Sequence, residues 1–258
     1  MKKILSKLSI LSVLLFFNAC SGPHGTYLDL GGQDFWTFRT ATNSFTANQT
    51  GQVEIPIFHI SDISTITPIN VNVTFTEGEE GLFTVTGTSF NSVDENNRAT
   101  IIISYNINDL DMGSPHTIRL SFSEQPDYPF SAGLITTTTV NITRPLDLEP
   151  LTFSEIGIGE FDSYFFDEVW PQPVLLANEA TVYKLPDLYA GGFNIFVVVN
   201  RRGEANIASQ PAWTHSAGIV EVRGTGVKVG NVITMQLQHW IPGVGQFGTF
   251  EEVLTLPE

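Results

Sequence analysis

The sequence predicts an all-β protein with two β-sandwich-like domains in tandem behind an N-terminal export signal. Three observations support this prediction. Residues 34–143 hold seven short runs in which apolar and polar side chains alternate. No window of ten residues in this half has a helical period. A second group of strand-like runs follows the segment 144–150, which contains two prolines.

The first twenty residues have the organisation of a secretory signal. Three lysines lie among the first seven residues, and residues 8–17 are an apolar run broken only by two serines. Ala19 precedes Cys20, the single cysteine of the chain, so cleavage would leave Cys20 as the new N-terminus. The apolar run has about half of the ~20 residues that a membrane-spanning helix needs. An ordinary secretory signal with an incidental cysteine stays the alternative.

The segment Phe17-Asn18-Ala19-Cys20 resembles a bacterial lipobox. It departs from the usual pattern, which has Leu in place of Phe17 and a smaller residue than Asn18. The resemblance implies that the Cys20 thiol carries a diacylglyceryl group and that at least two acyl chains anchor the protein, which is enough for stable attachment. Ser21, and not an Asp, follows the cysteine, and by resemblance to lipoprotein sorting in bacteria with two membranes this implies the outer membrane. No acidic tract follows, so the periplasmic and the cell-surface side both stay open.

The composition excludes some partners. Removal of residues 1–19 leaves 9 Lys and Arg against 27 Asp and Glu, a net charge of −18. Phosphate backbones repel a chain this acidic, so we expect no nucleic-acid partner. The carboxylates are spread along the chain, which is typical of a solvated surface rather than a binding tail. With Cys20 used by the lipid, no disulfide can form within the chain, and stability must come from apolar cores.

The strands of the first half are expected from alternation, which turns one apolar face toward a core. Ile118, Leu120 and Phe122, for example, lie on the same side of one run. Pro56 cannot donate to a strand ladder, so we expect its run to be an edge strand or to carry a bulge. The expected strands are 34–40, 52–60, 69–76, 82–87, 99–107, 116–123 and 134–143. Seven short strands at this spacing indicate an immunoglobulin-type β-sandwich.

Three segments of residues 50–143 also carry a family resemblance. They are Val53-Glu54-Ile55-Pro56-Ile57, the run from Ala99 to Ile103 that leads to Leu110 and Gly113, and the Thr-rich run 136–143. Together they resemble the immunoglobulin-like or Calx-β-like domains at the front of many outer-membrane lipoproteins of Bacteroidota. The resemblance covers a little over a third of the chain and implies a fold rather than an activity.

The second half is again expected to be β-rich. Strands are expected at an apolar run over 193–199, at the alternating run 232–240 and at a closing run over 250–256, with a hairpin signal at Gly230-Asn231. A sandwich and a barrel both fit, and so does a single domain that continues across 144–150. The favoured organisation is a signal peptide over 1–19, a lipidated cysteine and tether over 20–33, an immunoglobulin-like sandwich over 34–145 and a second all-β domain over 151–258.

The sequence offers little catalytic chemistry. The run Gly243-Val244-Gly245-Gln246-Phe247-Gly248 matches the dinucleotide fingerprint, but no helix or distal acid follows it, so a glycine-rich hairpin is expected instead. No serine lies in a nucleophile elbow. The paired acids Asp167-Glu168 and Glu251-Glu252 would point to opposite faces of a strand, so we expect solvated carboxylates rather than a glycosidase pair.

No metal or cofactor is expected either. The five histidines lack a zinc-protease spacing, and cysteine ligands are absent. Asp109, Asp111 and Gly113 imitate the start of a calcium loop, but the rest of that loop is missing. Calcium at a loop of the first domain stays an alternative. His59 and His239 lie in expected strands and are interpreted as satisfied or rim residues.

Aromatic residues provide the candidate binding site. A dense cluster is formed by Phe161, Tyr164, Phe165, Phe166 and Trp170. Core packing is the first interpretation, and a platform for sugar rings is the second. The candidate ligand-binding residues are Trp170, Trp213 and Trp240, on or beside expected loops, together with Asp167 and Glu168.

The sequence therefore favours a non-enzymatic cell-envelope lipoprotein that acts as a binding or accessory module, with a glycan or an envelope protein as partner. Two alternatives remain. Fimbrillin-type pilins are also exported lipoproteins of β-sandwiches, and by resemblance they lose an N-terminal segment after an arginine, for which Arg39 is the only early candidate. A hydrolase acting on carbohydrate is the third possibility.

Overall fold

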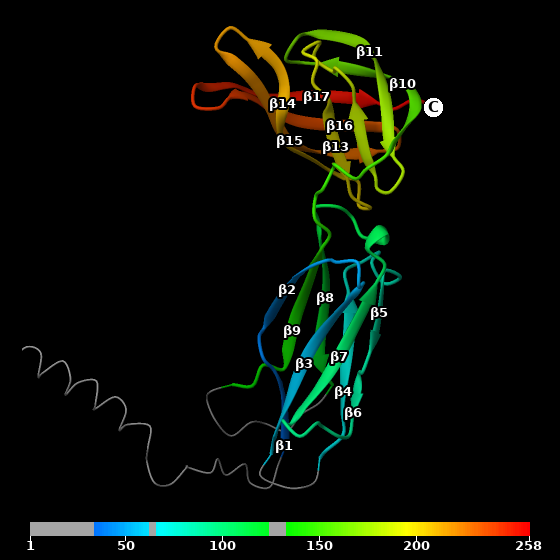
Figure 1. The fold of residues 1–258 in the computed structure, drawn as a ribbon, viewed down its shortest axis with the longest axis vertical. Helices are drawn as coiled ribbons and strands as arrows, with labels where there is room; N and C mark the ends of the chain where they lie inside the picture. Colours follow the sequence, from blue (N-terminus) through cyan, green and yellow to red (C-terminus); the bar gives the residue numbers. More distant parts are fainter. Residues whose placement is uncertain (1–33, 62–65, 124–132) are drawn as a thin grey trace, which may run out of the picture.

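The computed structural model describes residues 34–61, 66–123 and 133–258, and these residues are almost entirely β-strand (Figure 1). The only helix among them is a 3-10 turn at Ile107–Asp109. The all-β class is thereby confirmed. The signal peptide, the tether and the lipidation site at Cys20 lie outside the described residues.

Nine strands form a sandwich of two sheets. The four-stranded sheet has the order β1-β3-β7-β5, and the five-stranded sheet has the order β2-β9-β8-β4-β6. The strands are β1 (Asp34–Phe38), β2 (Thr42–Thr46), β3 (Gln52–Ser61), β4 (Ile69–Phe75), β5 (Phe83–Thr86), β6 (Ser89–Phe90), β7 (Arg98–Tyr105), β8 (Pro115–Phe122) and β9 (Thr137–Thr143). Seven of them match the strands expected from alternation; β2 and β6 are short, and most of their residues are exposed or half-buried.

The sandwich core is built from the inward face of each alternating strand, because successive side chains of a strand point to opposite sides. Ile101 and Ile103 of β7 and Ile118 and Leu120 of β8 are fully buried between the sheets. Trp36 of β1 belongs to the same core, as its early position in an alternating strand predicts.

Pro56 lies in an interior strand, so the expectation of an edge strand or a bulge is wrong. β3 runs between β1 and β7 without a register shift. His59 donates its backbone N–H to Asn97 next to β7, so alternation turns the nitrogen of Pro56 toward β1. β1 ends at Phe38, opposite Ile57. The proline therefore stands just past the end of its neighbour and removes no ladder hydrogen bond.

The remaining eight strands close into a barrel in sequential order, so the second domain is a barrel rather than a pair of packed sheets. Its strands are β10 (Phe153–Ser163), β11 (Glu168–Ala177), β12 (Val182–Leu185), β13 (Ile195–Val199), β14 (Glu204–His215), β15 (Gly218–Val229), β16 (Val232–Ile241) and β17 (Gly245–Thr255). An eight-stranded barrel leaves an interior that side chains fill or that holds one small ligand. Apolar residues from every side occupy this interior, among them Val174, Val197, Val222 and Leu237.

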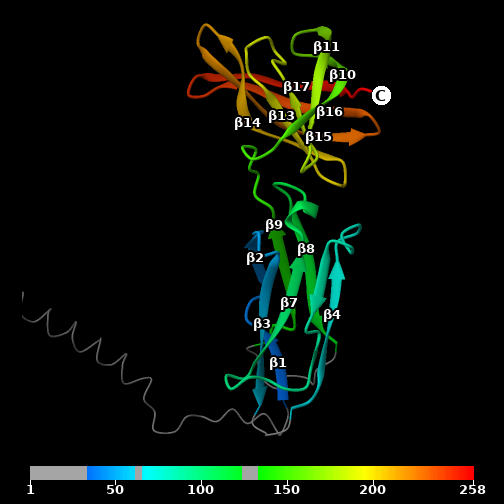
Figure 2. The same ribbon diagram turned by 45° about the vertical axis from the view of Figure 1, so that its right-hand side comes forward.

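Connections in such an up-and-down barrel alternate between its two ends. We call the end that carries the connections 164–167, 186–194, 216–217 and 242–244 the aromatic end. The opposite end carries the connections 178–181 and 200–203 and meets the sandwich; we call it the junction end. Figures 1 and 2 show the barrel stacked on one end of the sandwich, with β1 beginning near the other end.

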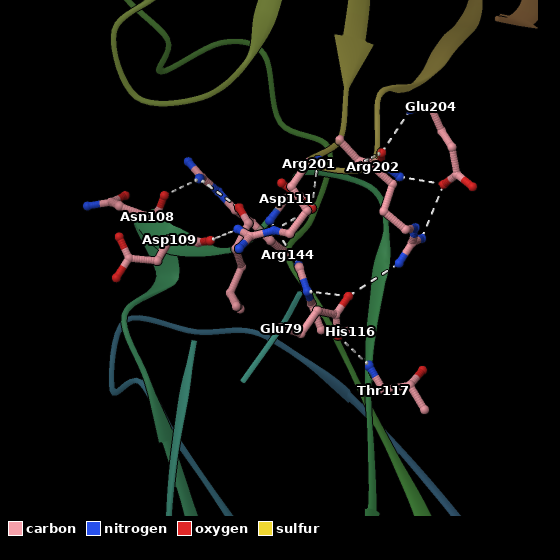
Figure 3. A network of polar contacts seen from close by, with 12 residues as sticks. Glu79, Asn108, Asp109, Asp111, His116, Thr117, Arg144, Arg201, Arg202 and Glu204 are labelled. Atoms are coloured by element: carbon pink, nitrogen blue, oxygen red, sulfur yellow. Dashed lines mark hydrogen bonds and ion pairs between the residues drawn. The ribbon is translucent and has the colours of Figure 1, made fainter. Parts of the chain in front are cut away.

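Two arginines of the barrel hold the junction by reaching acids of the sandwich (Figure 3). Arg201 Nε lies 3.0 Å from Asp111 Oδ2, and Arg202 Nη1 lies 3.3 Å from Glu79 Oε1. Glu79 is buried, and its second oxygen accepts the backbone N–H of Thr117 at 3.3 Å. Because one partner of the Arg202 pair is desolvated, this contact is worth more than an exposed surface ion pair.

The segment between the domains is partly packed rather than fully exposed. Arg144 is buried, and its Nη1 donates to the backbone oxygens of Leu110 in the sandwich and Glu179 in the barrel, both at 3.3 Å. Burial lowers the pKa of this guanidinium from its usual value.

An apolar cluster also spans the junction. Met112 of the sandwich lies in it with Ala177, Val182 and Val198 of the barrel, and Leu146 and Leu148 pack against it. These contacts argue against a loose hinge at this boundary.

Within the described ranges, no helix has the length and apolarity needed to cross a membrane.

Candidate functional site

An open groove of about 570 Å³ lies at the aromatic end of the barrel, along the free side of β11. It exists because β11 pairs with β12 only at Leu175 and Leu176, whereas it pairs with β10 along its whole length. The groove is lined by Phe166, Glu168, Trp170, Pro171, Gln172, Pro173, Pro186, Asp187, Leu188, Tyr189 and Ala190. It combines aromatic and proline surfaces with two exposed carboxylates, those of Glu168 and Asp187.

Local chemistry keeps this groove open. Pro171 and Pro173 cannot donate to a ladder, which makes β11 a poor template for a further strand. The side chain of Gln172, which is buried, crosses the gap and donates to the backbone oxygen of Pro186 at 2.8 Å. The opposite wall is a tight loop in which Asp187 and Ala190 have positive φ values of 47° and 53°. The groove is therefore a preformed feature of the fold.

Aromatic rings from four connections or strands meet beside the groove. Phe165, in the turn between β10 and β11, is the centre of the cluster. Its ring stacks on His239 with centroids 4.2 Å apart and an interplanar angle of 12°. Around it lie Phe166, Trp213, Phe247 and Phe250, with centroids 4.7–5.9 Å from its own.

Beneath this cluster, the barrel interior contains polar groups that lack hydrogen-bond partners. Glu252 and His239 are both fully buried, and Glu252 Oε1 lies 3.4 Å from His239 Nε2. Among the described residues, three of the buried polar groups in this interior have no hydrogen-bond partner: both oxygens of the Glu252 carboxyl group, His239 Nε2 and the hydroxyl of Tyr189. Burial and the nearby Glu252 carboxylate raise the pKa of Tyr189 well above its usual value. A buried unsatisfied polar group costs folding free energy, so three together require an explanation.

The strand register explains why these residues meet. Alternation along β16 turns His239 to the same face as Ile233, Met235 and Leu237. On β17, Glu252 shares the inward face with Leu254, whereas its neighbour Glu251 is exposed. The expectation that both acids of this pair are solvated is therefore wrong for Glu252. The period of the strand already carried this signal, since two successive residues cannot both face water on a one-sided sheet.

The structure brings some of the predicted binding residues together and separates others. Trp170 is half-buried in the groove, with its ring 6.4 Å from Tyr189, and Glu168 lies on the rim. Trp213 belongs to the adjacent aromatic cluster, 5.7 Å from Phe166.

Trp240 and Asp167 stand apart from this group. Trp240 alternates with the inward His239 and lies on the outer barrel surface under Arg223, whose guanidinium is 4.8 Å from the ring. Asp167 is exposed in the turn after Phe166, with a positive φ of 55°. The aromatic residues that the sequence analysis grouped together also have different environments, because Phe161 is buried in the barrel core and Tyr164 is exposed.

The other motifs have structural roles. Pro242 to Val244 form the turn before β17, and β17 begins within the glycine-rich run. Asp111 of the calcium-like run pairs with Arg201 at the junction. In the part of the chain that the structure describes, no group of three or more His, Cys, Asp and Glu residues is placed to hold a metal ion.

No family model and no curated protein matches the chain. Among solved structures, the apo form of the Calx CBD1 domain aligns at 14% identity and a TM-score of 0.34, over 45% of this chain and 99% of that one. A protein of unknown function from Bacteroides ovatus aligns at 8% identity and a TM-score of 0.37, over 89% of this chain and 92% of that one. Similarities this low carry no argument about function.

Proposed function

We propose that this protein is a non-enzymatic binding module of the cell envelope whose barrel holds carbohydrate in the groove along β11. The observation that carries this proposal is the groove itself, an open volume of about 570 Å³ with an aromatic wall and a carboxylate rim. It offers the half-buried ring of Trp170 beside the buried ring of Tyr189, and the exposed acids Glu168 and Asp187.

Carbohydrate suits this combination of surfaces. Aromatic faces pack against the C–H surfaces of sugar rings, and carboxylates accept hydrogen bonds from their hydroxyl groups. A preformed groove also limits the ordering cost of binding, since the walls are already held by Gln172 and the tight loop at Asp187. Loops and strand ends on a rigid scaffold are the usual place for such residues.

The remainder of the molecule supports a display role. The barrel lies at one end of the sandwich, and β1, the first described strand, begins near the other end, so the sandwich can act as a spacer. The packed junction would then fix the direction in which the groove faces. The proposal includes attachment to the outer membrane through lipid at Cys20, and an alkyne fatty acid should label the wild type and not Cys20→Ala. Equal labelling of both would contradict the anchor.

The test of the groove is a glycan array followed by titration calorimetry on the full mature chain. Trp170→Ala should weaken binding of an array hit by at least about tenfold, because it removes the stacking face. Trp240→Ala is the matched control, since it removes a tryptophan from the outer surface of the same barrel. Both variants must retain the circular dichroism of the wild type.

Three outcomes would contradict the groove proposal. The first is that no glycan binds the wild type at millimolar concentration, and the second is that both tryptophan variants lose equal affinity. The third is that the bound glycan is cleaved. The last outcome would instead indicate the carbohydrate hydrolase.

A pilin subunit is the second candidate, favoured by the position of Arg39. This residue is exposed directly after β1, an edge strand whose Phe35, Trp36 and Phe38 are buried in the sandwich. Cleavage after Arg39 would separate β1 from the chain and leave its place beside β3 for a strand of another copy. SDS-resistant ladders that require Arg39 would support this function, and an intact monomer after arginine-specific proteolysis would contradict it.

A further inference from the structure

The barrel interior holds the carboxyl group of Glu252, whose two oxygens have no hydrogen-bond partner among the described residues. His239 Nδ1 accepts a hydrogen bond from Trp213 Nε1 at 3.4 Å, so this nitrogen is unprotonated and the ring is neutral. Its proton is then on Nε2, which faces Glu252 Oε1 at 3.4 Å. His239 therefore supplies no cation to the carboxyl group of Glu252.

The basic residues of the barrel are all committed elsewhere. Lys184 lies over Phe153, Arg201 and Arg202 reach the sandwich, Arg223 lies over Trp240, and Lys228 donates to Gly230. The only ion-pair partner of Glu252 in the described part of the chain is His239. Buried charges in proteins are normally paired or bound to a metal. No metal-ligand cluster forms within the described ranges, which points to an organic cation.

Aromatic rings surround His239, the neighbour of Glu252, and organic cations bind favourably to such rings. The ring of Tyr189 lies 5.5 Å from His239, and that of Phe250 lies 6.1 Å from it. Trp213 and Phe247 belong to the aromatic cluster around Phe165, and their ring centroids are 5.5 Å apart. The negative faces of aromatic rings attract ammonium groups, and the attraction is strongest where water is excluded.

Phe165 occupies the centre of this space. It is half-buried and stands in the short turn 164–167, so its ring is carried by a connection rather than by the sheet. It covers the open face of His239 at 4.2 Å. A ligand of similar size could take the place of this ring if the turn moved outward, as loops do on timescales of nanoseconds to microseconds.

We propose that the barrel interior next to the aromatic end is a second binding site, for a small organic cation such as an alkylated ammonium group. Glu252 would provide the counter-charge, and the ring of Phe165 would fill the site when no ligand is bound. This site is distinct from the groove along β11. The ring of Tyr189 separates the two, because it contacts Trp170 on the groove side and His239 on the interior side.

The probes are choline and 3,3-dimethyl-1-butanol, which have the same shape but differ in charge. Titration calorimetry on the full mature chain should show choline binding at least about tenfold more tightly than the neutral alcohol. Phe165→Ala should tighten choline binding by about tenfold, because the ligand no longer has to displace the ring. Glu252→Gln should weaken it by at least about tenfold, because the counter-charge is lost.

Trp170→Ala is the control that separates the two sites, since it should lose glycan and keep choline. Phe165→Leu provides a second variant of this residue in case the alanine variant does not fold, and should give a smaller increase in choline affinity. The proposal is overturned if choline and the alcohol bind equally. It is also overturned if Glu252→Gln leaves choline affinity unchanged, or if neither the wild type nor a folded Phe165 variant binds choline.

Discussion

The sandwich and the barrel each bury a histidine against a carboxylate, but only the sandwich satisfies the pair. His59 Nε2 lies 2.9 Å from Asp34 Oδ2, and the same oxygen accepts the backbone N–H of Thr67 at 2.6 Å. In the barrel, His239 and Glu252 are 3.4 Å apart, and neither carboxylate oxygen has a hydrogen-bond partner among the described residues.

The second pair of the sandwich is satisfied at its carboxylate, although His116 Nδ1 itself has no hydrogen-bond partner among the described residues. His116 Nδ1 lies 3.2 Å from Glu79, which also accepts from Thr117 and pairs with Arg202 across the junction. The Nε2 of His116 accepts the backbone N–H of Asp111 at 2.9 Å. These contacts stabilise the sandwich and its attachment to the barrel.

The difference shows how one pairing of residue types can serve two purposes. A hydrogen-bonded buried pair contributes to a unique folded structure, whereas a buried group without partners lowers the stability of the domain that contains it. Proteins accept such a loss where a site must be ready for a ligand. The proposed function places binding in the barrel, where the unsatisfied pair lies, and gives the sandwich the role of support.

The largest expected effect on the free energy of unfolding comes from breaking the hydrogen-bonded pair of the sandwich. Asp34→Ala leaves His59 and the Thr67 N–H without their acceptor, so the free energy of unfolding should fall by about 3–5 kcal/mol. Trp36, the only tryptophan of the sandwich, packs 4.9 Å from His59 and reports the transition by fluorescence during urea denaturation. Glu54→Ala, an exposed change on the neighbouring strand β3, should leave the midpoint nearly unchanged.

A smaller effect is expected from pH, with opposite signs in the two domains. Burial raises the pKa of Asp34, but hydrogen bonds from Thr67 and His59 outweigh it, so the folded pKa is lowered. Burial lowers the pKa of His116. In both cases the unfolded chain binds the proton more readily. The sandwich should therefore lose stability as pH falls below about 6.5, and further below about 4.

The barrel should respond to alkali instead. Burial raises the pKa of Tyr189, so the folded state holds its proton longer than the unfolded state does. The stabilisation from this group is complete below about pH 10 and is lost as pH rises above it. Each pKa unit of difference corresponds to about 1.4 kcal/mol. Differential scanning calorimetry across pH would contradict this contrast if acid destabilised the barrel first.

Much of the fold was predictable from the sequence, because alternation is a direct consequence of strand geometry. Seven strands of the sandwich follow from it, as do β13, β16 and β17 in the barrel within a few residues. Closure of the barrel was not predictable, since β10 must pair with β17 far along the chain, for example Phe161 with Leu254, which lies 93 residues later.

The candidate site was only partly predictable. Trp170 and Glu168 were identified from residue type and from their position beside an expected loop, and both line the groove. The inward orientation of Glu252 followed from alternation, but its residue type favoured the surface. Its proximity to Tyr189 depends on how the loop 186–194 folds over the barrel, which no local pattern encodes.

The most direct test of the contrast compares two isosteric changes, Glu79→Gln and Glu252→Gln, by denaturant unfolding of the full mature chain. Glu79→Gln weakens contacts to His116, Thr117 and Arg202, so the free energy of unfolding should fall by about 1.5–3 kcal/mol. Glu252→Gln replaces a buried carboxyl group that has no hydrogen-bond partner among the described residues with a neutral amide, so stability should rise by about 1 kcal/mol. Opposite signs are the predicted result. A loss of stability in Glu252→Gln as large as that in Glu79→Gln would contradict the account.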